Sequence, residues 1–247
     1  MRFAILLTAT ALAACSTGGD KPKEAQAPLH SRMLVLDTHL DTPLHFERAG
    51  WNFADRHSLA DDMAQLDIPR MKDGNLDGGF FAIYTEQGPL TAKGYAHALA
   101  FARGRSDLID KTIAANSDAI APALTAADAL RLNKEGKLIA FKSMENSYPL
   151  GEDLSLLQGF YDKGLRLAGP VHSKDNQFAD SATGEGRWKG LSPLGKQWVA
   201  EMNRLGIVID ASHSGLLFST AAAAQAVAFL REGRFEHPAP AAGPAAA

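Results

Sequence analysis

The stretch that decides the fold is MLVLDTHLD, residues 33–41, in which an apolar, strand-forming run leads directly into metal-competent side chains. Side chains alternate between the two faces of an extended chain, so Asp37, His39 and Asp41 are expected on the same face. In parallel α/β enzymes the catalytic groups lie at the carboxyl ends of strands. His-x-Asp is a short and weak motif alone, but here it predicts a candidate metal site at a strand end.

Four further runs have the same character, since each is apolar and begins at or just after a glycine. They are residues 78–85, 137–145, 165–171 and 207–212. Helices are expected between the strands, at about 62–71, 95–116, 125–136, 154–163 and 192–205, with Thr125 and Ser192 as N-caps. The alternation predicts an α/β fold with a parallel sheet, organised as a (β/α)8 TIM barrel that is incomplete, with about five strands.

The composition is that of an ordinary globular protein with one sizeable core. The chain has 247 residues, of which 46% are hydrophobic and 21% are charged. The net charge of -3 provides no basic surface stripe, so a nucleic-acid-binding function is not expected.

The N-terminus has the features of a bacterial export signal. Arg2 precedes an apolar run that ends in Leu-Ala-Ala-Cys15, which resembles a lipoprotein box. Cleavage before Cys15 would leave a lipid-modified cysteine, and Ser16 after it favours the outer membrane, facing the periplasm. The alternative is an ordinary secretory signal that contains a cysteine by chance. Because Cys15 is the only cysteine, no disulfide can form within the chain.

The composition changes again near the C-terminus. The chain becomes alanine-rich from Ala221, and PAPAAGPAAA at 238–247 is of low complexity and cannot form a core. We therefore expect a lipoprotein signal peptide at 1–14, a tether at 15–31, a partial barrel domain at 32–220 and an Ala/Pro-rich tail at 221–247.

Chemistry-bearing side chains recur at the expected strand ends, which is more specific than any single motif. They are His39, Asp41, Glu145, His172 and His213. A carboxylate between two cations can bridge them, and oxygen and nitrogen ligands of this kind suit zinc. Taken one at a time, each residue also has an ordinary structural explanation as a hydrogen-bonded pair, a cap or a turn residue. Asp37 either orients His39 or caps the strand end.

Longer blocks of the chain resemble the membrane dipeptidases, peptidase family M19, which are zinc enzymes with amidohydrolase-like barrels. The blocks lie at 37–43, 78–84, 143–145, 164–181 and 190–213. The resemblance implies that His39 and Asp41 bind one zinc, that Glu145 bridges two, and that His213 binds the other. It implies that His172 binds the substrate and polarises its carbonyl, and that a metal-bridging hydroxide attacks the peptide bond of a dipeptide. It further implies tolerance of a C-terminal D-residue.

The chain departs from the family pattern after Ser214. A second Ser-His pair, a substrate-binding arginine and a proton-shuttling aspartate cannot be placed there, which indicates a C-terminal truncation or a shifted reading frame. We therefore expect an incomplete second zinc site and impaired activity. His30, His45, His57, His97 and His237 are expected to be surface or packing histidines.

Three alternatives remain open at this level. One is another amidohydrolase-like hydrolase such as a lactonase, although no lysine is expected at a strand end to form the carboxylated bridge of that group. The second is an inactive, lipid-anchored remnant, and the third is an interaction protein. A homodimer is also left open.

Overall fold

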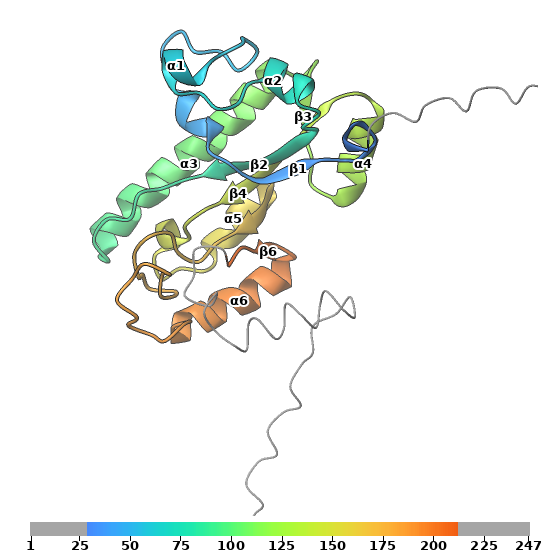
Figure 1. The fold of residues 1–247 in the computed structure, drawn as a ribbon. Coiled ribbons are helices and arrows are strands. Elements are labelled where there is room, and N and C mark those ends of the chain that lie inside the picture. Colours follow the sequence, from blue (N-terminus) through green and yellow to red (C-terminus); the bar gives the residue numbers. More distant parts are fainter. Residues whose placement is uncertain (1–28, 212–247) are drawn as a thin grey trace, which may run out of the picture. The chain divides into compact units, whose positions relative to one another are not determined.

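The computed structural model describes residues 29–211, so Cys15, His213 and the Ala/Pro-rich tail lie outside the described residues. The chain divides into two units, Met1–Met33 and Leu34–Ala247. The described part of the first unit holds one 3-10 turn, η1 (His30–Arg32). The second unit holds the sheet and its helices (Figure 1).

The sheet is all-parallel and follows the order β1-β2-β4-β5-β6, with β3 paired to β4. Its strands are β1 (Leu36–Leu40), β2 (Gly78–Ile83), β3 (Ile120–Pro122), β4 (Leu138–Met144), β5 (Leu165–Ala168) and β6 (Val208–Ile209). The five expected strands are confirmed, as is the barrel-type α/β arrangement. Strand β3 was not expected from the sequence, because three residues carry too little alternation to signal a strand.

Helices connect successive strands and lie beside the sheet (Figure 1). The α-helices are α1 (Leu59–Asp62), α2 (Ile68–Asp73), α3 (Ala92–Ala115), α4 (Ala126–Lys134), α5 (Leu156–Asp162) and α6 (Pro193–Leu205); the 3-10 turns are η2 (Thr42–His45) and η3 (Tyr148–Leu150). The single helix expected near 62–71 is wrong. Met63 has a left-handed φ of 65° that ends α1, and Asp67 caps a separate helix, α2.

The two expected N-caps are confirmed. Thr125 and Asp128 form a reciprocal capping box at the start of α4. The side chain of Ser192 accepts a hydrogen bond from the Gly195 N–H at the start of α6.

Strand β4 lies at the centre of the sheet, and all seven of its residues are buried. Such a strand has an apolar sequence because both of its faces are covered. The exceptions are Ser143 and Lys142. The Nζ of Lys142 lies 3.1 Å from Ser106 Oγ and 2.8 Å from the Asp110 carboxylate, both on α3. Burial lowers the pKa of Lys142, although its contact with Asp110 opposes the change. The α3–β4 contact therefore contains a polar link within an apolar layer.

Strands β2 and β4 approach each other closely at Gly78. A Cβ atom at this position would lie 2.2 Å from the carbonyl oxygen of Ile139. The glycine is therefore required by the spacing of the two backbones.

Candidate metal centre

The central carboxylate of the site is fixed by the backbone of three strands. Glu145 follows β4, and its N–H donates to the Ile83 carbonyl of β2 at 3.4 Å. On the other side, the Gly169 N–H donates to the Met144 carbonyl at 2.9 Å. The sheet therefore continues past β4 on both sides, and Glu145 has a fixed position at the carboxyl ends of the strands.

Side chains from two other strand ends converge on this carboxylate. His39 Nε2 lies 3.4 Å from Glu145 Oε2 and 3.3 Å from Asp41 Oδ1. His172 Nε2 lies 3.1 Å from Glu145 Oε1. Each oxygen of Glu145 thus has its own histidine, which is the disposition required of a carboxylate that serves two neighbouring positions.

The environment favours positive charge on His39. Its hydrogen bonds with Asp41 and Glu145 raise its pKa from 6.5 to about 10, against the opposing effect of burial. An imidazole must be neutral to bind a metal ion, so a cation at this site replaces a proton.

The donor set fits a zinc ion. One nitrogen of His39 and one oxygen each of Asp41 and Glu145 lie within 4.8 Å of one another. Zinc binds imidazole and carboxylate ligands of this kind, and catalytic zinc sites keep a position open for water or substrate. Glu145 is 6% exposed, whereas Asp41 is 56% exposed. The carboxylate in the middle is therefore buried, and the outer ligand is accessible from solvent.

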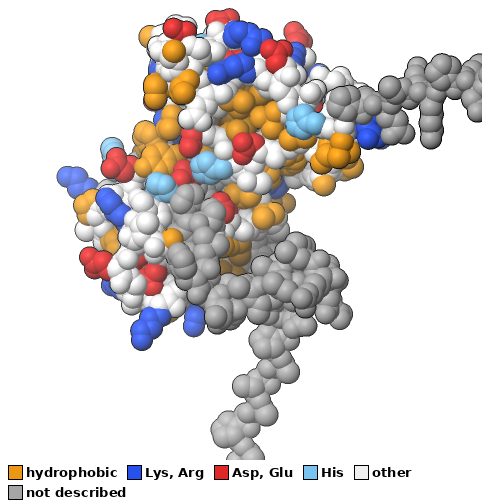
Figure 2. Space-filling model, in the orientation of Figure 1, with side chains coloured by type: hydrophobic (Ala, Val, Ile, Leu, Met, Phe, Trp, Pro, Cys, Tyr) orange, Lys and Arg blue, Asp and Glu red, His pale blue; other side chains and the backbone are white. Residues whose placement is uncertain are grey.

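A cavity of about 420 Å³ opens beside the centre, within the size range of small-molecule sites. Six of its lining residues are His39, Asp41, Leu44, His45, Met63 and Gln65. Figure 2 shows histidine and acidic side chains exposed close together on one face, with hydrophobic side chains around them. The centre can thus be reached by a small, partly apolar molecule.

Asp37 contacts the backbone of His39. Its Oδ1 accepts a hydrogen bond from the His39 backbone N–H at 2.9 Å. This contact favours the capping interpretation over the orienting one.

Some residues of the site were missed from the sequence. Tyr84 follows β2, and its ring packs edge-on against His172 with centroids 5.5 Å apart. Burial, followed by nearby acids including Glu145, raises the pKa of the Tyr84 hydroxyl, which therefore stays protonated. The sequence did contain an indication of this role, because Tyr84 follows a predicted strand just as Glu145 does.

His45 and His57 pack on either side of Trp51, at centroid distances of 5.5 Å and 4.4 Å, as expected of packing histidines. His45 also lines the cavity beside the metal centre, which could not be predicted from the sequence.

A family model for membrane dipeptidases, peptidase family M19, matches residues 23–229. The match spans all of the residues that converge at the strand ends. The chain belongs to the membrane dipeptidase family. The lysine-bridged alternative finds no support in the described residues, since Lys142 of β4 contacts α3.

Relatives within and around this family agree with the assignment. The chain is 33% identical over 186 residues to dipeptidase tcpJ of Claviceps purpurea, covering 72% of this chain and 43% of that one. The crystal structure of the probable dipeptidase PvdM of Pseudomonas aeruginosa matches with a TM-score of 0.67 and 32% identity, covering 75% of this chain and 48% of that one. A metallo peptidase of Rhodobacter sphaeroides, liganded with a phosphinate mimic of L-Ala-D-Ala, matches with a TM-score of 0.61 and 29% identity, covering 73% and 58%. The chain therefore spans about half the length of these relatives.

Within residues 29–211, no helix has the length and apolar character needed to cross a bilayer.

Proposed function

We propose that this chain is a zinc-dependent dipeptidase, in which His39, Asp41 and Glu145 hold the metal and His172 binds the substrate. The observation that carries the proposal is the buried Glu145 carboxylate, with one oxygen toward His39 and the other toward His172. Membership of the dipeptidase family supports the reaction class. Zinc bound at such a centre lowers the pKa of a water molecule and polarises a carbonyl group.

The protein's own groups have distinct parts in this proposal. Asp41 and Glu145 supply negative charge that favours a cation, while His39 gives up its proton when the metal binds. His172, which contacts Glu145 at the strand ends, is assigned the part of binding the carbonyl oxygen of the scissile peptide. Tyr84 packs against the His172 ring and limits its rotation. In the full family arrangement that the sequence suggests, His213 adds a ligand for a second zinc.

We propose that the substrates are dipeptides, including those with a D-residue at the C-terminal position. The ligand of the Rhodobacter sphaeroides relative, a mimic of L-Ala-D-Ala, supports this choice. The cavity of about 420 Å³ beside the centre is suited in size to such a small substrate.

We further propose that turnover by the 247-residue chain is low. Within the described residues, the candidate ligand group contains three members, all around one position. A second zinc needs additional ligands, of which the sequence offers His213. The first zinc is therefore expected to bind more tightly than the second, because three described ligands surround the first position.

The test combines metal analysis with a dipeptidase assay on L-Ala-D-Ala and L-Ala-L-Ala. The wild-type chain should bind zinc and release alanine slowly, whereas Glu145→Gln should lose both properties. Glu135→Gln, an exposed substitution at the C-cap of α4, is the matched control and should retain both. A chain that binds no zinc, or a Glu145→Gln variant with unchanged turnover, would refute the proposal.

We also propose attachment to the bacterial cell envelope through a lipid on Cys15, with the protein facing the periplasm from the outer membrane. The support is the sequence Leu-Ala-Ala-Cys15 after an apolar run. Mass spectrometry of the mature N-terminus should find an acylated Cys15 in a membrane fraction. Cys15→Ser should release the protein from that fraction, and an unmodified Cys15 would exclude the anchor.

A further inference from the structure

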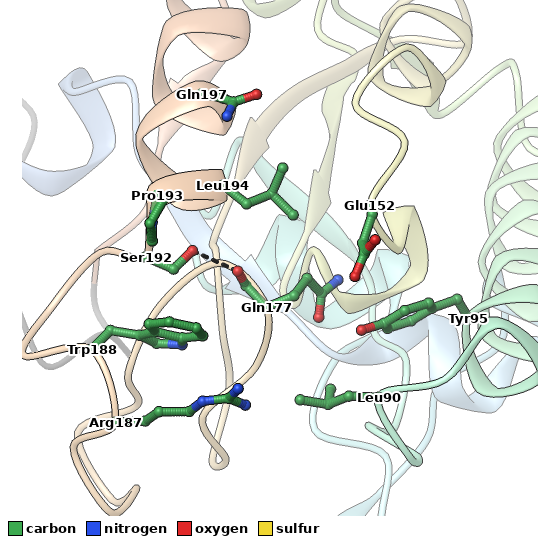
Figure 3. Close-up of a pocket in the computed structure, with 10 residues that line it drawn as sticks. All are labelled: Leu90, Tyr95, Glu152, Gln177, Arg187, Trp188, Ser192, Pro193, Leu194 and Gln197. Carbon is green, nitrogen blue, oxygen red and sulfur yellow. Dashed lines mark hydrogen bonds between the residues drawn. The ribbon is translucent and has the colours of Figure 1, made fainter.

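A second cavity, of about 590 Å³, lies apart from the metal centre and shares no lining residue with the cavity beside it. Its walls come from the segment after β2, the start of α3, the segment after η3, the long connection between β5 and α6, and the start of α6 (Figure 3). Neither edge strand of the sheet contributes to it. The cavity is therefore formed by loops and helices of the described fold and opens to solvent.

The floor of this cavity carries a buried hydrogen-bond acceptor without a partner. Gln177 is 8% exposed, and its Nε2 donates to the carbonyls of Tyr148 at 3.1 Å and Gly151 at 2.9 Å. Because both partners are carbonyl oxygens, the amide end that faces them must be the NH2 group, and the other end is Oε1. Among residues 29–211, Oε1 has no hydrogen-bond partner, although Gln177 lines the cavity. A buried acceptor of this kind is costly unless a donor reaches it.

Two opposite charges flank this acceptor. Glu152 and Arg187 both line the cavity, and both are exposed. In Figure 3 their side chains approach the space around Gln177 from different walls, Glu152 from the side of Tyr95 and Arg187 from the side of Trp188. Burial raises the pKa of Tyr95, Glu152 raises it further, and Arg187 lowers it, so both charges act at the same hydroxyl.

The rest of the lining includes apolar side chains and a fixed aromatic ring. The Trp188 indole N–H donates to the Asn176 carbonyl at 2.9 Å, and the Arg187 guanidinium lies 4.4 Å from the centroid of its ring. Leu90 and Leu194 line the same space. A side chain of moderate size can therefore be buried here next to separated charges.

We propose that this cavity binds a free α-amino acid with an apolar side chain. The ammonium group donates to Gln177 Oε1 and faces Glu152, the carboxylate pairs with Arg187, and the side chain packs against Leu90, Leu194 and the Trp188 ring. An acceptor, a carboxylate and a guanidinium around one apolar space match the three parts of such a ligand. The site is separate from the metal centre and does not depend on the proposed dipeptidase activity.

The first test is calorimetric titration of the full chain with L-leucine in the presence of a metal chelator. Binding with one ligand per chain is expected, because no metal takes part. L-Leucinamide lacks the carboxylate and N-acetyl-L-leucine lacks the ammonium group, so both should bind about tenfold more weakly or worse. Absence of L-leucine binding, binding that disappears with the chelator, or equal binding of all three compounds would overturn the proposal.

The second test uses exposed residues, so that the fold is retained. Arg187→Gln should weaken L-leucine binding about tenfold but leave L-leucinamide nearly unaffected, since the amide makes no carboxylate pair. Glu152→Gln should weaken both compounds, because both carry an ammonium group. The controls are Arg103→Gln on α3 and Glu135→Gln at the C-cap of α4, both exposed and outside the cavity, which should bind like the wild type. Equal affinities in all four variants would contradict the assignment.

Discussion

At the scale of single residues, Asp67 shows how a buried charge is held in this fold. Its side chain is fully buried and accepts hydrogen bonds from the His57 N–H at 2.8 Å, the Arg70 N–H at 2.8 Å and the Arg70 guanidinium at 2.6 Å. Burial alone would raise the pKa of Asp67, but these bonds outweigh it and the pKa is lowered below 3.8. Asp67 therefore links the loop before α1 to the start of α2.

We expect Asp67→Asn to lower the free energy of unfolding by about 2 kcal/mol at neutral pH, since it removes the ionic part of this network. The folded-state pKa is lowered, so the stabilisation is present above the unfolded value of 3.8 and is lost as pH falls through the folded value. Urea unfolding should therefore show a difference between the two proteins that is constant near neutrality and shrinks below about pH 4. A difference that grows in acid would contradict this account.

Asp41 and Asp37 form a matched pair for testing the metal centre. Asp41 Oδ1 lies 3.3 Å from the His39 ring, whereas Asp37 accepts from the His39 backbone. Asp41→Asn should weaken zinc affinity by about tenfold or more, while Asp37→Asn should leave it nearly unchanged. Competition with a chromogenic zinc chelator measures both. Equal losses would mean that Asp37 acts on the metal, contrary to the capping interpretation.

The location of the site residues could be predicted from the sequence where they lie at strand ends. His39, Glu145 and His172 each follow an apolar run, so the sequence alone brings them to one edge of a parallel sheet. Gln177 offered no such signal. It lies in an irregular connection, and its unpartnered oxygen depends on which carbonyls its amide nitrogen reaches.

At the scale of elements, the pairing of β2 with β4 depends on Gly78. Gly78→Ala should lower the free energy of unfolding by about 3 kcal/mol or more, because its Cβ would lie 2.2 Å from the Ile139 carbonyl oxygen. Gly104→Ala is the control, since a Cβ there meets nothing within 4 Å and alanine suits the interior of α3. That variant should be more stable by about 1 kcal/mol. Thermal unfolding followed by circular dichroism measures both, and similar stabilities in the two variants would be inconsistent with the close approach.

Element boundaries were predicted best where local chemistry determines them. Thr125 and Ser192 accept hydrogen bonds from the first turns of their helices, so the starts of α4 and α6 were readable. β3 was not readable, because its three residues become a strand only through pairing with β4. The break between α1 and α2 depends on the left-handed backbone of Met63, a conformation that its residue type does not favour.

At the scale of the whole molecule, the path of the described sheet ends in β1 and β6, each of which has one partner in the part that the structure describes. The short strand β3 likewise pairs with β4 alone there. The parallel α/β class and the order of elements followed from the alternation of strands and helices. Whether the barrel closes depends on pairings between distant segments, which no local pattern specifies. The same holds for the homodimer, which stays a prediction.

Edge strands recruit further strands from other chains, so we expect self-association of the 247-residue protein that increases with concentration. Val208 of β6 is 58% exposed, and Val208→Lys should reduce association by placing a charge on the edge. Leu130→Lys on α4, where Leu130 is 55% exposed, is the matched control and should leave association unchanged. Size-exclusion chromatography with light scattering makes the comparison. Equal masses for the two variants at every concentration would exclude the edge as the cause.

The lysine within the α3–β4 contact has a chemical consequence of its own. A lowered pKa leaves more of the Lys142 amine uncharged and nucleophilic, yet the packed helix keeps acylating reagents away from it. Covalent labelling of this amine is therefore expected to be faster when α3 separates from the strand beneath it. The rate at which Lys142 is acetylated in the folded protein would then record how often that layer opens.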